Sequence, residues 1–198
     1  MLTASFGGGD PSRLLFTYSG DPALDAFYQN EALNLVYTFG ISPTGFFYDD
    51  AAGPNAFATS EMFIYHPQRP DGTVVLGIRL MIDELRNDGG RGHAVRAILA
   101  HEFAHLAQFR AGGTERGKRP ELQADFLAGW YTRLVGVPSF ELMPVLNAFY
   151  SRGDYKFNDP IHHGTPDERL AATSAGYASS ATTFDAAWLE SVRFVSAL

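Results

Sequence analysis

Residues 101–105 of this chain read His-Glu-Phe-Ala-His, and apolar residues recur around them at intervals of three and four. This spacing predicts an amphipathic helix over about residues 91–111, which two glycines then end. Four residues advance an α-helix by about 400°, so His101 and His105 share one face. Two imidazoles placed in this way can bind one metal ion, while Glu102 beside them can point at a water on that metal.

A second pair of acidic residues follows at the same helical spacing. Glu121 and Asp125 stand four residues apart, in a helix predicted from about residue 120 to 135. The short, glycine-containing connection from the first helix lets the second fold back onto it. Catalytic zinc takes three protein ligands and leaves a fourth position open. We therefore expect His101, His105 and Glu121 to bind one zinc ion per chain, and Asp125 to accept the second N–H of His101.

Composition and charge limit the classes of function. The 198 residues suit a single domain over 1–198, and 45% apolar with 19% charged residues is typical of a globular chain. A net charge of −7, from 15 basic and 22 acidic residues, argues against nucleic acid or an anionic membrane as the main partner. Cysteine is absent, so any metal must be held by His, Asp or Glu.

Apolar runs and the N-terminal sequence bear on localisation. No stretch reaches the ~20 apolar residues of a membrane-spanning helix. The first residues lack the basic start and apolar run of a secretory signal. We expect a cytoplasmic protein, exported only if a leader peptide was removed from this chain.

The rest of the chain predicts an α+β domain in which helices outnumber strands. Two strands at 56–66 and 73–81, joined by a turn, are expected to form an antiparallel hairpin. Residues 1–20 are expected to be a flexible or strapping segment that includes a short strand near 14–18, and 41–55 a loop with one short strand. Further helices are predicted over about 22–39, 139–150 and 184–197, and from a capping box at Thr165 to Glu168.

Several motifs together resemble a known family. HEFAH at 101–105 followed by ELQADFLAGWY at 121–131 resembles the HExxH…ExxxD signature of gluzincin metallopeptidases. The resemblance extends to the CaaX-prenyl-endopeptidase and heat-shock protease branch, and to the putative neutral zinc metallopeptidases. PNAFAT at 54–59 resembles the NAFATG segment of the first branch, and HGTPDER at 163–169 resembles its HPP…R segment. The resemblance implies a mainly helical, zincin-like metallopeptidase domain with a small antiparallel sheet beside the HExxH helix.

The resemblance also suggests residues that face the substrate carbonyl. It implies this role for Asn55 and His163, and Arg169 is a further candidate. From the residues alone, Asn55 can equally be a turn residue and His163 an exposed loop residue. Arg169 is better explained by an ion pair, for example with Asp125. The chain departs from the membrane branch in lacking spanning helices and in having Gly164 where that branch has proline.

The expected function is a soluble, zinc-dependent peptide hydrolase acting on a peptide or protein. Glu102 would take a proton from a zinc-bound water and pass it to the leaving amine. The strand after Asn55 would align an extended peptide through main-chain hydrogen bonds. Two alternatives stay open: a zinc hydrolase of a non-peptide amide, and a non-catalytic binding module that the metal braces. Glu102 favours an enzyme, because a structural zinc site has four protein ligands and needs no base.

Overall fold

The computed structural model describes residues 15–53, 55–113, 117–155 and 162–198. Most of the expected 1–20 segment and Pro54 therefore lie outside the described residues. The helices and strands are, in chain order, α1 (Pro22–Phe39), β1 (Thr44–Tyr48), β2 (Ala56–Thr59), β3 (Thr73–Gly77), α2 (Ile78–Asn87), α3 (His93–Arg110), α4 (Lys118–Leu134), the 3₁₀ turn η2 (Ser139–Glu141), α5 (Met143–Tyr150), α6 (Pro166–Ala178) and α7 (Phe184–Ser196).

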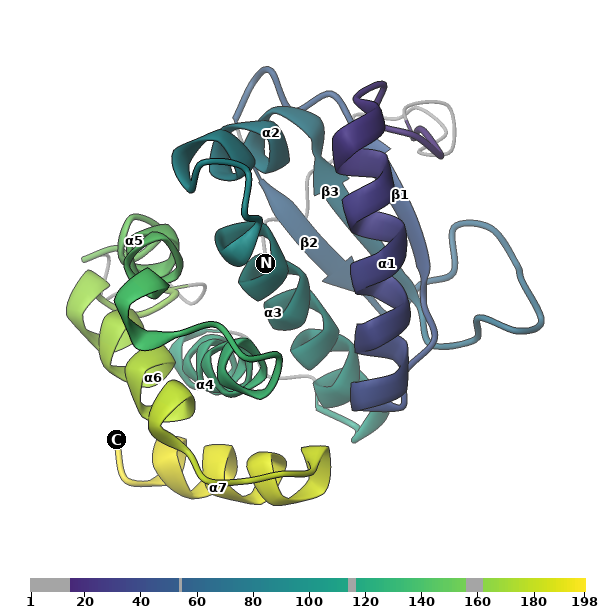
Figure 1. Ribbon diagram of the computed structural model, residues 1–198. Coiled ribbons are helices and arrows are strands. Elements are labelled where there is room, and N and C mark those ends of the chain that lie inside the picture. The colour runs from purple at the N-terminus through teal and green to yellow at the C-terminus, as the bar shows by residue number, and fades with distance from the viewer. Residues whose placement is uncertain (1–14, 54, 114–116, 156–161) are drawn as a thin grey trace.

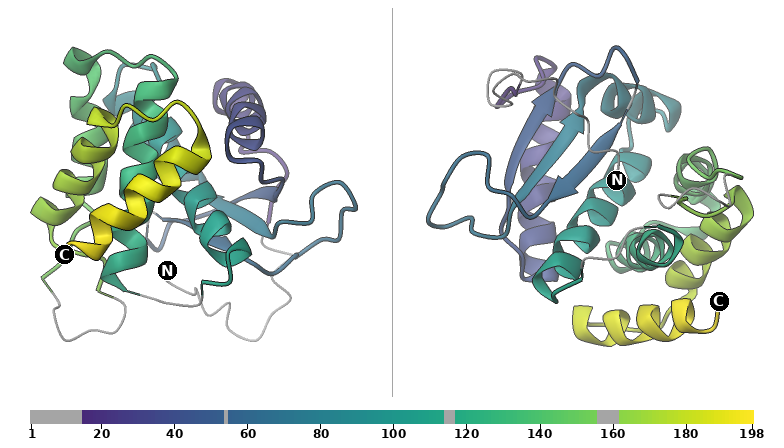
Figure 2. Two further views of the ribbon diagram at one scale, coloured as in Figure 1. Left: turned by 90° about the horizontal axis from the view of Figure 1, so that it is seen from below. Right: turned by 180° about the vertical axis from the view of Figure 1, so that it is seen from behind.

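The sheet has three strands in the order β1-β3-β2. β2 pairs antiparallel with β3, as expected, but it ends at Thr59 and not near residue 66, so a longer loop joins the two strands. β1 pairs parallel with β3. The sheet is therefore mixed, and the expectation of a purely antiparallel sheet was wrong. β1 and β3 run in the same direction, and β2 runs the opposite way along the other edge of β3. Helices α1 and α3 cover one face of this sheet (Figure 2).

The second strand of the hairpin ends earlier than its sequence indicates. Residues 78–81, which continue the apolar run, form the first turn of α2 instead. The reason lies about 30 residues away. The Asp50 carboxylate accepts hydrogen bonds from the backbone N–H groups of Arg79 (2.8 Å) and Leu80 (3.1 Å), which caps the helix from another loop.

Helix α3 occupies the centre of the molecule. It lies between the sheet on one side and the layer of α4, α5, α6 and α7 on the other (Figure 1). Apart from Arg96, every residue from Ala94 to Gln108 is buried. The helix therefore carries small and apolar side chains all round, and each polar side chain on it needs either a partner inside the protein or access to a cavity.

Helices α4 and α6 pack closely at two glycines. A Cβ atom at Gly129 would lie 2.0 Å from the carbonyl oxygen of Thr173, and one at Gly176 would lie 1.8 Å from that of Phe126. Neither position has room for a side chain, so the two backbones can approach only because both residues are glycine. This contact sets the distance between Asp125 on α4 and Arg169 on α6.

Most predicted helices are present near their predicted bounds. Asp21 caps α1, and Thr165 and Glu168 form the expected capping box at α6. The helix expected at 139–150 is divided into η2 and α5, and Phe16 makes only an isolated bridge to Phe47. Among the described residues, no helix combines the length and hydropathy needed to cross a membrane.

Candidate metal centre

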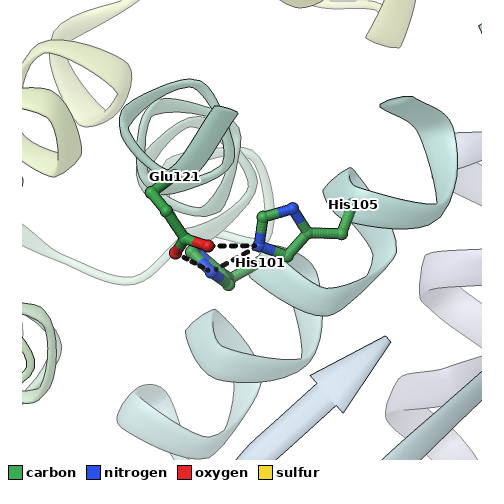
Figure 3. A group of neighbouring side chains, drawn as sticks. All are labelled: His101, His105 and Glu121. Atoms are coloured by element: carbon green, nitrogen blue, oxygen red, sulfur yellow. Dashed lines mark hydrogen bonds and ion pairs between the residues drawn. The ribbon is translucent and has the colours of Figure 1, made fainter. Parts of the chain in front are cut away.

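Three donor side chains converge where α3 meets the first turn of α4 (Figure 3). The Nε2 atoms of His101 and His105 lie 3.0 Å apart. Glu121 reaches both rings, with Oε2 3.4 Å from Nε2 of His101 and Oε1 3.5 Å from Nε2 of His105. All three residues are buried. The expected ligands are therefore brought together in one group.

The spacing of these donors fits a tetrahedral metal site. Metal–ligand bonds of about 2.0–2.1 Å at tetrahedral angles place neighbouring donor atoms roughly 3.3–3.4 Å apart. The contacts above span 3.0 to 3.5 Å. Within the described parts of the chain, this is the group of His, Asp and Glu residues that can surround one ion. Two imidazoles and a carboxylate can hold a divalent first-row metal there.

Each histidine has a side-chain oxygen close to its Nδ1 atom. Asp125 Oδ1 lies 2.9 Å from Nδ1 of His101, as its helical spacing from Glu121 predicts. Gln108 Oε1 lies 2.8 Å from Nδ1 of His105, and the Gln108 amide nitrogen donates to the carbonyl oxygen of Pro120 at 2.8 Å. Because the Gln108 nitrogen donates to Pro120, the Gln108 oxygen is left to accept a hydrogen bond from the Nδ1–H of His105. The Nε2 atoms of both histidines face the centre of the group.

Gln108 is a part of the site that the sequence analysis missed. It stands three residues after His105, on the same side of α3, so helical spacing could have pointed to it. Glutamine is common on helices, however, and its role here depends on Pro120, which only the folded chain brings near.

Arg169 supports the site from α6. Its Nε donates to Asp125 Oδ2 and its Nη2 to Asp125 Oδ1, both at 2.7 Å, while Nη2 lies 3.9 Å from Glu121 Oε2. Both groups of this pair are buried. The favoured alternative for Arg169, an ion pair with Asp125, is the arrangement found, and its guanidinium is directed at Asp125.

The charges of this group stabilise one another. Burial alone would lower the pKa of His101, but the carboxylates of Asp125 and Glu121 outweigh it and raise that pKa to about 9. Burial opposes ionisation of Glu121 as well, yet the two histidines hold its pKa well below the ordinary value. Arg169 and His101 likewise lower the pKa of Asp125 against its burial. In the metal-free protein, a proton on His101 therefore supplies the positive charge that a metal ion would supply.

Glu102 faces a cavity of about 250 Å³ beside the metal ligands. The residue is buried, with 5% of its surface exposed. No group in the described part of the chain donates a hydrogen bond to its carboxylate, in contrast to Glu121 and Asp125. A carboxylate in this position can accept a proton from a water molecule in the cavity.

The cavity extends from the metal ligands along the edge strand and between α2 and α5. Its walls include residues of β2 and apolar residues of three helices. The residues other than the metal ligands and Glu102 are Asn55, Ala56, Phe57, Ala58, Leu80, Ile98, Phe149, Arg152, His163 and Arg169.

The two residues expected to face the substrate carbonyl both line this cavity. Asp154 holds His163, accepting from its backbone N–H at 3.2 Å and lying 3.3 Å from its Nδ1. Burial lowers the pKa of His163. Asn55 is fixed through its backbone, whose oxygen accepts from the N–H of Gly77 at 2.9 Å. Neither Asp154 nor Gly77 carried a sequence signal for these contacts.

Comparisons with known proteins give no relative from which a role could be transferred: no family model, no curated protein and no solved structure matches this chain.

Proposed function

We propose that this chain is a zinc-dependent peptide hydrolase of the gluzincin type, built on a zincin-like fold. One observation carries the proposal. A buried His-His-Glu group and the carboxylate of Glu102 border the same cavity, and Glu102 has no hydrogen-bonding partner in the described chain. A base beside an open metal position distinguishes a catalytic site from a structural one.

His101, His105 and Glu121 would hold the ion. A bound Zn²⁺ would polarise the substrate carbonyl and make water more acidic. Glu102 takes the proton of the attacking water and delivers it to the leaving nitrogen, a transfer worth about 10²–10⁴ in rate. Asp125 and Gln108 keep the two imidazole rings oriented throughout.

The edge of the sheet supports a peptide as the substrate. β2 is the outer strand of the order β1-β3-β2, and Ala56, Phe57 and Ala58 line the cavity. An extended peptide can add to such an edge through main-chain hydrogen bonds, which holds its carbonyl groups in register. His163 and Asn55, at the border of the same cavity, are the candidates for contact with the scissile carbonyl.

A second candidate follows from the size of the cavity. About 250 Å³ is below the range of roughly 300–1,000 Å³ typical of sites for drug-sized ligands. A small non-peptide amide would also fit such a space. The same residues would perform the same proton transfer on it.

Metal content and hydrolysis test the proposal together. Zinc-loaded protein is dialysed and measured by elemental analysis, then incubated with a peptide library and with small amides, with and without a chelator. We expect one zinc per chain, reduced in Glu121→Ala, and peptide cleavage that the chelator stops and added zinc restores. The variant Glu102→Gln tests the proposed base. Glu61→Gln, on an exposed loop, is its matched control. Full zinc content in Glu121→Ala, or cleavage that survives complete metal removal, would contradict the proposal.

A further inference from the structure

One wall of the cavity has no part in the proposed chemistry. Leu80 from α2, Ile98 from α3 and Phe149 from α5 form its apolar section, and Arg152 follows in the turn after α5. We name these four residues the α2–α5 wall. The ring centroids of Phe149 and His101 lie 5.6 Å apart, so the wall adjoins the metal centre.

The two arginines that line the cavity differ in what binds their guanidinium groups. Arg169 makes two hydrogen bonds to Asp125 and a third to the backbone oxygen of Arg152. Arg152 donates from Nη2 to Glu84 Oε1 at 2.8 Å and from Nη1 to the carbonyl oxygen of Ala148. A guanidinium has five N–H groups, so within the described chain three of those on Arg152 remain for a ligand.

Of the Arg152–Glu84 ion pair, the arginine lines the cavity. The Arg152 side chain is 28% exposed and lines the cavity, whereas that of Glu84 is 14% exposed and does not. Glu84 stands one helical turn after Leu80 on α2, behind the apolar section. Its carboxylate holds the guanidinium in place, and a fixed planar guanidinium suits a second carboxylate better than a mobile ammonium does.

We propose that Arg152 determines specificity by binding a carboxylate of the substrate, whose apolar stem packs on Leu80, Ile98 and Phe149. The carboxylate is an acidic side chain or the C-terminus of the peptide, since both offer the same two oxygens. The inference rests on the proposed function, because it requires a substrate in the cavity. Arg152 is placed as a binding residue and takes no part in proton transfer.

Matched peptides test this assignment. Fluorogenic peptides of one sequence carry Glu, Gln or Lys at successive positions around the cleaved bond, and a second set compares a free C-terminal acid with its amide. We expect kcat/KM to favour one of the two acids over its neutral counterpart by about tenfold. Whether the Glu/Gln or the acid/amide ratio is raised identifies the source of the carboxylate.

Variants on both sides of the ion pair separate recognition from structural support. Arg152→Gln should bring the acid preference to about one, and Arg152→Lys should retain part of it. Glu84→Gln removes the charge that holds the guanidinium in place, so the preference should fall but not disappear. A merely structural ion pair would instead lower stability similarly in Arg152→Gln and Glu84→Gln and leave the ratios unchanged. Arg86→Gln is the control, because Arg86 lies on α2 with Glu84 but does not line the cavity. Its acid-to-neutral ratios of kcat/KM should match those of the wild type.

The assignment of Arg152 can be tested even if no peptide is hydrolysed. If no peptide is cut, the proposed function fails, and binding of the same acid and amide peptides to zinc-loaded Glu102→Gln is measured by fluorescence anisotropy. Tighter binding of the acid form that disappears with Arg152→Gln supports the assignment. Equal kcat/KM and equal binding of acid and neutral peptides, or a preference that survives Arg152→Gln, would overturn it.

Discussion

Replacing Asp125 with asparagine tests the support of the metal centre with almost no change in side-chain volume. In the wild type its two oxygens accept from Arg169 at 2.7 Å each, and one lies 2.9 Å from Nδ1 of His101. Asparagine keeps one oxygen but places an N–H₂ group beside a donor of Arg169 or His101. The guanidinium of Arg169, 4% exposed, then stays buried without its nearest counter-charge.

The expected loss is large because this pair is almost completely buried. Removing one partner of a buried ion pair costs about 3–5 kcal/mol. In a protein of this size that lowers the melting temperature by roughly 6–20 °C. Zinc affinity should fall by about 10–100-fold, since His101 loses the group that orients it.

Denaturant unfolding of the metal-free protein and competitive zinc titration measure the two effects separately. Arg169→Met with Asp125→Asn completes a double-mutant cycle. A loss of unfolding free energy below about 1 kcal/mol in Asp125→Asn, together with unchanged zinc affinity, would refute the assigned role.

Four other predictions follow from the same geometry. Glu102→Gln should retain zinc, as elemental analysis will show, and lose about 10²–10⁴ in kcat; a fully active variant would remove Glu102 from the mechanism. The pKa of His101 is raised to about 9 in the metal-free protein, so zinc binding at pH 7 should release about one proton and tighten as pH rises toward 9. Calorimetry in buffers with different heats of ionisation checks this, and a heat independent of the buffer would contradict it. The same raised pKa stabilises the metal-free fold fully below about pH 6.5, and this contribution disappears as pH rises through 9, so metal-free unfolding free energy should fall over that interval. Gly176→Ala would place a Cβ atom 1.8 Å from the oxygen of Phe126, so α4 must shift; we expect a loss of at least about 1–3 kcal/mol and weaker zinc binding, measured by thermal melting and titration, and a stable variant with normal affinity would argue against close packing here.

The sequence predicted the features that depend on neighbouring residues. Asp21 before Pro22 and the Thr165–Glu168 capping box mark helix starts by contacts within four residues. The meeting of His101 with His105 is equally local, because helical spacing alone places both on one face. Such contacts require only that the local helix forms.

The features that escaped prediction depend on residues distant in the chain. Asp50 starts α2 from about 30 positions away, and without it residues 78–81 read as the end of a strand. The pairing of Arg152 with Glu84 spans 68 positions and joins the end of α5 to α2. Neither contact has a periodic pattern, so only the packing of the elements reveals it.

The balance of charge in the centre favours a divalent ion over a purely structural network. Glu102, Glu121 and Asp125 bring three negative charges, and Arg169 with a protonated His101 brings two positive ones, which leaves a formal charge of −1 in a buried site. Replacing the proton on His101 with a dication brings the sum to zero. A monovalent ion would leave the same excess as the proton, and an excess charge is costly where water is excluded. The residue responsible for the excess is Glu102, so under the proposed function one carboxylate would both favour a dication and serve as the base.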